Sequence, residues 1–219
     1  MFSYVYMKIL ESQPERYDRG ISWLSLGKID QIKKKIVEEE VKPGEKILEI
    51  GVGTGILAIM CARKGAKVLG IDISPAMLEV ARKKVREEGL KEAIELKEMS
   101  ISEMDKLEGE FDLVIATLVF SELYSQEQDY ALTQAYRLLR AEGKLIIGDE
   151  TRPQNFFKYL IYFLVRLPLW LITFLLTQTT TRAVVGIEER IKKAGFRIIK
   201  LERSFLDSFI YLVAVKERR

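Results

Sequence analysis

Three glycines lie close together in the stretch LEIGVGTGILA, at Gly51, Gly53 and Gly55. The apolar residues before them predict a strand and those after them predict a helix, so the glycines form the turn between the two. A turn without side chains lets backbone amides approach a ligand at the amino end of the helix. Glu49 ends the predicted strand, where its carboxylate can hold a ligand's ammonium group. The sequence therefore predicts a ligand site on this turn.

A second acidic residue narrows the kind of ligand. The run KVLGID predicts a strand that ends in Asp72, a position where a carboxylate can accept both hydroxyl hydrogens of a ribose. We therefore expect a ligand that contains a nucleoside. The dinucleotide fingerprint requires its third glycine three positions after the second, but that position is Ile56. A nicotinamide oxidoreductase is thus the less favoured alternative.

The elements that position these residues alternate from residue 44 onward. Apolar runs with β-branched residues predict strands, and amphipathic stretches that end in glycine predict the crossover helices between them. The predicted strands cover residues 46–50, 67–71, 94–98, 112–117 and 143–148. The three helical stretches are TGILAIMCARKGA, SPAMLEVARKKVREEG and QEQDYALTQAYRLLRAEG. A further helix in GIEERIKKAG precedes two strands, in FRIIKLERSF and DSFIYLVAVKER, that pair as a hairpin.

These elements predict a doubly wound α/β fold with a mostly parallel seven-stranded sheet whose last strand is antiparallel. We expect one domain with an N-terminal helical lid at 1–43, in which KIDQIKKKIVEEE forms a solvated helix face over the sheet. A cofactor-binding core follows at 44–150, then an apolar helical cap at 151–182, and the last helix with its hairpin at 183–219.

Composition excludes several classes of function. The 219 residues contain no histidine, which argues against zinc chemistry, Ser-His-Asp hydrolysis and a histidine base, and we expect no metal site. A net charge of +3 is too small to indicate a nucleic-acid partner. The single cysteine, Cys61, lies in an apolar helical run and reads as part of a core. Without a signal-peptide pattern at the N-terminus, we expect a cytoplasmic protein.

The sequence EIGVGTG, preceded by KPGEKIL and followed by GIDIS, resembles the first two motifs of class I S-adenosylmethionine-dependent methyltransferases. The resemblance implies S-adenosylmethionine as the cofactor, with its methionyl part at the glycine turn, its amino group near Glu49 and its ribose at Asp72. Ile73 and Met77 match positions that flank the adenine ring, although both are equally consistent with an ordinary core. The implied cofactor-binding residues of these two motifs are Glu49, Gly51, Gly53, Gly55, Asp72, Ile73 and Met77.

Most of residues 16–150 is similar to methyltransferases of ubiquinone and menaquinone biosynthesis. In such proteins the tyrosine of a YD pair lies near the sulfonium, which makes Tyr17 a candidate lid residue for both cofactor and catalysis. The sequence departs from the family after strand three, where Met99-Ser100-Ile101 replaces Gly-Asp-Ala. In the family the aspartate of Gly-Asp-Ala reaches the adenine amino group. Here backbone atoms or the Ser100 hydroxyl must take its place, beside Ile101.

A second departure concerns the base. Ser121-Glu122 stands where the family often has paired histidines after strand four. The carboxylates expected near the ends of strands four and five are Glu122, Asp149 and Glu150, of which Glu122 is our preferred general base. We expect Thr117, at the end of strand four, to shape the cofactor pocket rather than to react.

The apolar segment 157–176 is long enough to cross a bilayer, but a single crossing would separate the last helix and strands from their sheet. We therefore expect two short helices, broken near Pro168, that form a roof over the active site. Residues among Phe156, Tyr159, Phe163 and Trp170 should lie within reach of its cavity. Such a cap suits a small apolar or quinone-like acceptor, and its outer surface is available to a membrane or to a second copy of the chain.

Three hypotheses of function stay open at this point. The first is a methyltransferase for such an acceptor, the second a cofactor-binding scaffold without turnover, and the third a nicotinamide oxidoreductase. The opening MKILESQPERYDRGI is also similar to methyltransferases associated with corrinoid proteins, which would make a corrinoid protein the partner.

Overall fold

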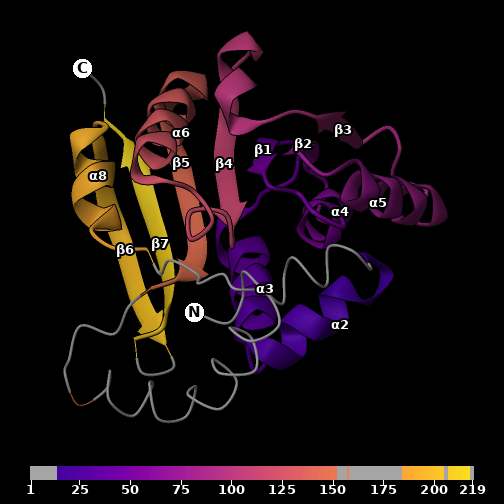
Figure 1. Ribbon diagram of the computed structural model, residues 1–219. Coiled ribbons are helices and arrows are strands. Elements are labelled where there is room, and N and C mark those ends of the chain that lie inside the picture. The colour runs from indigo at the N-terminus through magenta and orange to yellow at the C-terminus, as the bar shows by residue number, and fades with distance from the viewer. Residues whose placement is uncertain (1–13, 152–156, 158–183, 205–206, 218–219) are drawn as a thin grey trace.

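The computed structural model describes residues 14–151, 157, 184–204 and 207–217 (Figure 1). The strands are β1 (Lys46–Ile50), β2 (Lys67–Asp72), β3 (Ile94–Glu98), β4 (Phe111–Thr117), β5 (Leu139–Glu150), β6 (Phe196–Ser204) and β7 (Phe209–Lys216). The helices are α2 (Pro14–Leu24), α3 (Lys28–Glu40), α4 (Ile56–Arg63), α5 (Pro75–Glu87), α6 (Ser125–Leu138) and α8 (Ile187–Lys193), with a short 3₁₀ helix η1 (Ile101–Lys106).

The seven strands form one sheet in the order β3-β2-β1-β4-β5-β7-β6. Strands β1 to β5 pair in parallel, whereas β7 is antiparallel to both β5 and β6. The predicted mostly parallel sheet, its antiparallel last strand and its C-terminal hairpin are therefore confirmed. The chain reverses its direction of crossover between β3 and β4, so the carboxyl ends of β1 and β4 lie side by side (Figure 1).

Helices cover both faces of the sheet, as the doubly wound prediction requires. Successive residues of β1 point to opposite faces, so that Ile47 belongs to one apolar core and Leu48 to the other. The core around Ile47 is covered by α2, α3, α4 and α5, and the core around Leu48 by η1, α6 and α8 (Figure 1). Both faces of the parallel strands are thus shielded from water.

The N-terminal segment is helical over the residues that the structure describes. Helix α3 is the charged run of the prediction, and it buries Ile29, Ile32 and Ile36 against the sheet while most of its charges face water. Glu40, at the end of the helix, is buried instead, and it binds Lys144 Nζ at 2.7 Å. The helix therefore lies over β5 through an apolar stripe and one paired carboxylate.

The predicted end of α6 is wrong. Glycines do follow α4 and α5, at Gly65 and Gly89, both with positive φ angles. Helix α6 instead ends at Leu138, and β5 begins at the next residue because Leu139 pairs with Phe111 of β4. Gly143 lies inside β5, so pairing with the sheet ends this helix before its glycine is reached.

The predicted cap lies almost entirely outside the described residues, and its roofing role stays a prediction. Phe157 is the one described position between 151 and 184, and its side chain is exposed. Within the part of the chain that the structure describes, no helix is long and apolar enough to cross a bilayer. The division into four segments of one domain likewise stays a prediction.

Candidate active site

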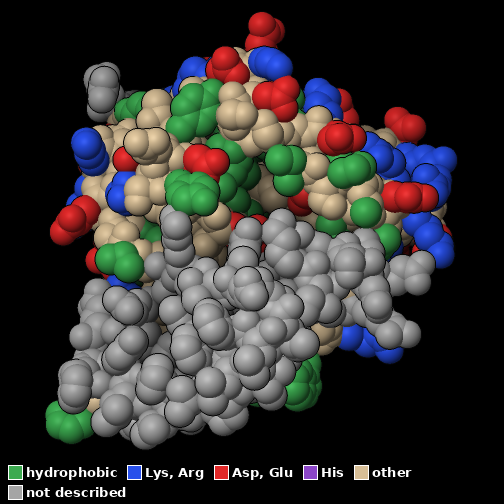
Figure 2. Space-filling view, in the orientation of Figure 1, with side chains coloured by type: hydrophobic (Ala, Val, Ile, Leu, Met, Phe, Trp, Pro, Cys, Tyr) green, Lys and Arg blue, Asp and Glu red, His purple; other side chains and the backbone are tan. Residues whose placement is uncertain are grey.

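A cavity of about 740 Å³ opens at the carboxyl ends of β1, β2 and β4. Figure 2 shows it as a hollow near the centre of the face, above the grey residues. Its volume lies in the range of small-molecule and cofactor sites. Because crevices at this edge of a doubly wound sheet bind ligands, this is the expected place for the site that the sequence predicts.

The glycine turn forms one wall of this cavity. Gly51 and Gly53 line it, and both have positive φ angles, 69° and 53°, that favour glycine. A Cβ atom on Gly51 would overlap Cγ2 of Val119, which follows β4. The turn after β1 and the turn after β4 are therefore packed directly against each other. Gly55 does not line the cavity, because it faces Ala81 of α5, 3.1 Å from the position of a Cβ atom.

Gly51→Ala is expected to lower the free energy of unfolding by about 2 to 4 kcal/mol, because it adds backbone strain and an overlap with Val119. Urea denaturation measures the change. Gly89 is the matched control, since it has the same φ of 69° and nothing within 4 Å of its Cβ position. Gly89→Ala should cost only the strain of about 1 kcal/mol, and equal losses in the two variants would contradict the packing argument.

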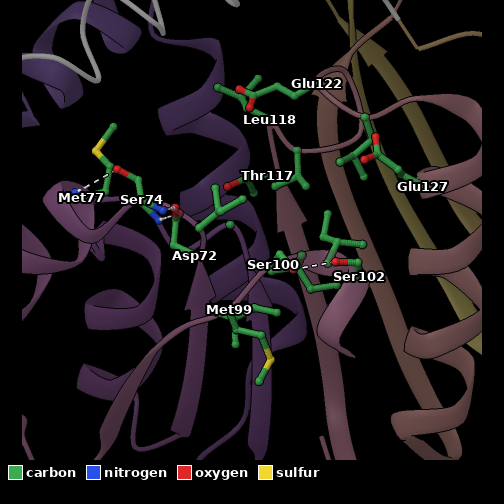
Figure 3. A pocket seen from close by; sticks show the side chains of 18 of the residues that line it. Asp72, Ser74, Met77, Met99, Ser100, Ser102, Thr117, Leu118, Glu122 and Glu127 are labelled. Atoms are coloured by element: carbon green, nitrogen blue, oxygen red, sulfur yellow. Dashed lines mark hydrogen bonds between the residues drawn. The ribbon is translucent and has the colours of Figure 1, made fainter. Parts of the chain in front are cut away.

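Asp72 holds the turn from the side of β2. Its Oδ2 accepts a hydrogen bond from the Gly53 amide at 2.7 Å, and its Oδ1 accepts one from the Ser74 amide at 2.9 Å. Burial raises the pKa of the Asp72 carboxyl above its usual value, and the two amides partly offset this rise. Ser74 and Pro75 begin α5 as N-cap and first residue, which fixes Asp72 at the helix start (Figure 3).

Two of the residues predicted to flank adenine lie beside Asp72. Ile73 is largely exposed at the cavity wall, with 73% of its surface accessible. Met77 is buried beside Ser74, whose hydroxyl accepts the Met77 amide (Figure 3). An exposed isoleucine next to a carboxylate gives this wall an apolar surface that a flat ring can cover. A ligand bound at this wall would bury the exposed surface of Ile73.

Glu49 lies beneath the glycine turn rather than in the cavity wall. Its side chain is 2% exposed, and Oε2 has no hydrogen-bond partner among the described residues. Burial raises the pKa of this carboxyl from 4.5 to about 8. An unpaired buried carboxyl oxygen costs free energy, which a cationic ligand group nearby would reduce.

The segment after β3 supplies the wall opposite Asp72. Ser100 and Ile101 both line the cavity, at the start of η1. The Ser100 hydroxyl donates to Glu103 Oε2 at 3.0 Å, and Glu103 in turn accepts the Ser100 amide at 3.1 Å. Both Ser100 donors thus bind the Glu103 carboxylate at the start of η1, as in a capping box. The Ser100 oxygen also accepts a hydrogen bond from the Ser102 hydroxyl at 2.7 Å, which leaves one lone pair for a ligand's amino group (Figure 3).

The turn after β4 carries the candidate base. Thr117 and Glu122 both line the cavity, and Figure 3 shows Glu122 beside Leu118, at the end of the cavity away from Met99. Leu118, which lies between Thr117 and Glu122 in the sequence, has a φ of 57°, an uncommon conformation for a leucine. Such strain persists where the surroundings impose it, and it is found at functional sites.

Asp149, one of the other candidate bases, is buried and holds this turn in place. Its Oδ2 accepts the Ser121 amide at 3.2 Å and its Oδ1 accepts the Glu150 amide at 2.7 Å. Burial raises the pKa of Asp149 to about 6. Neither Asp149 nor Glu150 lines the cavity, so Glu122 is the only one of the three candidate carboxylates that a substrate in the cavity can reach.

The N-terminal helix reaches the cavity through Tyr17. The next residue, Asp18, binds both Thr54 of the glycine turn and Lys84 of α5. Sequence reasoning missed Asp18, although it lies next to Tyr17 in the YD pair. It also missed the wall that α6 contributes, where Gln126, Glu127 and Tyr130 line the cavity.

Most of the predicted site residues are brought together. One cavity is lined by Tyr17, Gly51, Gly53, Asp72, Ile73, Met77, Ser100, Ile101, Thr117 and Glu122. Glu49 and Gly55 lie just outside it, for the reasons given above. The roles of these residues toward a ligand stay predictions, which the proposals below take up.

Known proteins similar to this chain share its core. A family model described as a methyltransferase domain matches residues 47–143. The demethylmenaquinone methyltransferase of Lactobacillus johnsonii is 32% identical over 143 residues, which are 64% of this chain and 58% of that protein. The phosphatidylethanolamine N-methyltransferase of Cereibacter sphaeroides is 34% identical over 140 residues, or 63% of this chain and 68% of that protein. The chain thus spans little more than half the length of the first of these relatives.

Solved structures agree on the fold. A magnesium protoporphyrin IX methyltransferase from Synechocystis PCC 6803 with bound S-adenosylhomocysteine has a TM-score of 0.66 at 22% identity, covering 87% of this chain and 82% of that one. A (4+2)-cyclase has a TM-score of 0.69 at 16% identity, over the same shares of the two chains. Proteins with different reactions therefore share this architecture, and the site must decide the function.

Proposed function

Since the chain belongs to the class I S-adenosylmethionine-dependent methyltransferases, we propose that it transfers a methyl group from S-adenosylmethionine to a small, apolar acceptor. The observation that carries the proposal is the cavity at the carboxyl ends of the strands. It combines the glycine turn, Asp72 and Glu122. A nicotinamide oxidoreductase finds no support in the spacing of the glycines or in the relatives.

The residues around the cavity fit this cofactor. Gly51 and Gly53 leave room at the turn for the methionyl part, and the unpartnered Glu49 oxygen beneath the turn suits its ammonium group. Asp72 offers carboxylate oxygens to the ribose hydroxyls. The adenine would lie between the apolar Ile73 and the Ser100 oxygen, which can accept from its amino group.

S-adenosylmethionine supplies a methyl group on a positively charged sulfur, and its transfer is a displacement that needs alignment and exclusion of water. Tyr17 of α2 lines the cavity, as do Thr117 at the end of β4 and Leu118 after it, and together they would help to enclose the methyl group. When the acceptor atom carries a proton, that proton must leave as the new bond forms. The Glu122 carboxylate is placed to take it.

A quinone-like acceptor is the favoured substrate class. The cavity wall near Glu122 includes Leu118, Val119 and Leu123, which offer an apolar surface. Similarity to the demethylmenaquinone methyltransferase points the same way. A ring carbon that gains a methyl group must lose a proton, which gives Glu122 a role.

A lipid amine is the second candidate, favoured by the acidic side chains Glu122 and Glu127 at the same cavity and by similarity to the phosphatidylethanolamine N-methyltransferase. The two are separated by supplying methyl-labelled S-adenosylmethionine with either reduced demethylmenaquinone or phosphatidylethanolamine vesicles. Label in the quinone supports the first candidate, and label in the lipid supports the second. Bound S-adenosylhomocysteine without turnover on any acceptor, a corrinoid protein included, would favour a scaffold.

Asp72→Ala is expected to weaken S-adenosylhomocysteine binding by about tenfold or more, because it removes charged hydrogen bonds to the ribose. Isothermal titration calorimetry measures the change. Asp112 is the matched control: it accepts the Lys46 amide at 2.6 Å, at the other end of the sheet. Asp112→Ala should reduce stability and leave affinity unaltered. Unchanged affinity in Asp72→Ala would remove Asp72 from the cofactor site.

A further inference from the structure

Helix α2 contributes a carboxylate that the proposed cofactor and acceptor roles do not use. Asp18 Oδ1 accepts a hydrogen bond from Thr54 Oγ1 at 2.5 Å. Its Oδ2 pairs with Lys84 Nζ of α5, also at 2.5 Å. One side chain thus joins the N-terminal helix, the glycine turn and α5, which are far apart in the sequence.

The glycine turn is held by two carboxylates at neighbouring residues. Asp72 accepts the amide of Gly53 at 2.7 Å, and Asp18 accepts the hydroxyl of Thr54. Thr54 is 3% exposed, so its hydroxyl has little access to water as an alternative partner. Because Thr54 lies between two glycines with positive φ angles, the conformation of the turn determines where this hydroxyl points.

We propose that Asp18 is a positioning residue, through which the docking of α2 and the conformation of the glycine turn depend on each other. The proposal rests on the proposed function, because the turn and Tyr17 belong to the methyl-transfer cavity. Asp18 follows Tyr17 directly, so the bond to Thr54 also helps to fix Tyr17 in the cavity wall. By linkage, a ligand that stabilises docked α2 must itself bind more tightly when α2 is docked, by the same coupling free energy.

The two bonds of Asp18 contribute unequally. Its side chain and that of Lys84 are 29% and 26% exposed, so water and salt weaken their attraction. The Thr54 hydroxyl is buried, and a buried hydrogen bond to a charged group is the stronger contact. We therefore assign the coupling to the Thr54 bond, with Lys84 holding the carboxylate in its orientation.

The test combines calorimetry of S-adenosylhomocysteine binding with hydrogen exchange of the α2 amides, measured with and without that ligand. In the wild type, the ligand should slow exchange in α2. Thr54→Val should weaken binding by about tenfold and should abolish this slowing at saturating ligand. Thr54→Ser keeps the hydroxyl and should restore both. Arg63→Gln, which breaks an exposed ion pair with Glu88 elsewhere, is the control and should change neither.

A double-mutant cycle separates coupling from a direct contact of Thr54 with the ligand. If Asp18 acts through Thr54, the Asp18→Ala and Thr54→Val variants and their combination should all weaken binding to the same extent. Additive losses would overturn the proposal, as would ligand-induced slowing of α2 exchange that survives in Thr54→Val.

Failure of the proposed function gives a different result. A wild type that does not bind S-adenosylhomocysteine overturns the cofactor assignment. The ligand-free proteins still decide the role of Asp18. Thr54→Val should speed exchange in α2 and leave exchange in α6 as it is, whereas unchanged α2 exchange would overturn the positioning role.

Discussion

Glu122→Gln is expected to lower turnover by about a hundredfold or more while cofactor affinity stays the same. The glutamine keeps the size of the side chain but cannot accept a proton from the acceptor. Glu122 is the carboxylate of the cavity wall that follows β4, at a turn held by the buried Asp149. The measurement is the rate of methyl transfer to reduced demethylmenaquinone, together with calorimetry of S-adenosylhomocysteine.

The matched control is Glu110→Gln, the same change in an exposed residue before β4, at the opposite end of the strand. It should leave turnover intact. Turnover of the Glu122 variant within a factor of about two of the wild type would refute the base, since general-base catalysis contributes far more than that. That outcome would instead fit an acceptor that is already nucleophilic, such as a thiolate or a reduced corrinoid cobalt.

The parts of the fold that sequence predicts well are those with local signals. Strands β1 and β2 are recognised from short apolar runs, and the turn between strand and helix from its glycines, so both can be predicted from adjacent residues alone. Asp72 ends β2, as the prediction requires, and lies beside the glycine turn because parallel strands end at the same edge. Local pattern and strand order together therefore predict the centre of the cavity.

The end of α6 shows where a local signal loses to the sheet. Gly143 predicts a helix stop, but pairing of Leu139 with Phe111 starts β5 earlier. Glu142 then adopts the positive φ of 63° that a glycine would tolerate better. Long-range pairing of strands outweighs the preference of a single residue, which no window of sequence shows.

Two contacts at the site differ in whether the sequence predicts them. The contact between Ser100 and Glu103 is predictable, because serine and glutamate three positions apart are the signature of a capping box. The hydrogen bond between Asp18 and Thr54 is not predictable in this way. It joins residues 36 positions apart, and no local sequence pattern indicates that their two elements pack together. Contacts of this second kind require the structure.

Glu49→Gln is expected to make the ligand-free protein more stable than the wild type at high pH. Burial raises the pKa of Glu49 from 4.5 to about 8, so the folded protein favours the protonated carboxyl. The wild type therefore loses stability as the pH rises from about 4.5 through about 8, because the buried group must ionise. This shift corresponds to on the order of 4 to 5 kcal/mol. The glutamine variant has no proton to lose and lacks this dependence.

Urea denaturation at pH 5 and pH 9 measures the effect as a difference between variant and wild type, in which other titrating groups such as Asp149 cancel. Glu79→Gln, at an exposed position of α5, is the control, and its difference should be the same at both pH values. A Glu49 difference that does not grow with pH would show that the carboxylate is compensated in the folded protein.

Saturating S-adenosylhomocysteine should reduce the stability advantage of the Glu49→Gln variant at pH 9. A carboxylate beneath the turn that pairs with the ligand's ammonium group is stabilised in its charged form. The ligand should then stabilise the wild type more than the Glu49→Gln variant. Equal stabilisation of both proteins by the ligand would place the ammonium group away from Glu49, although the dependence of ligand-free stability on pH would still stand.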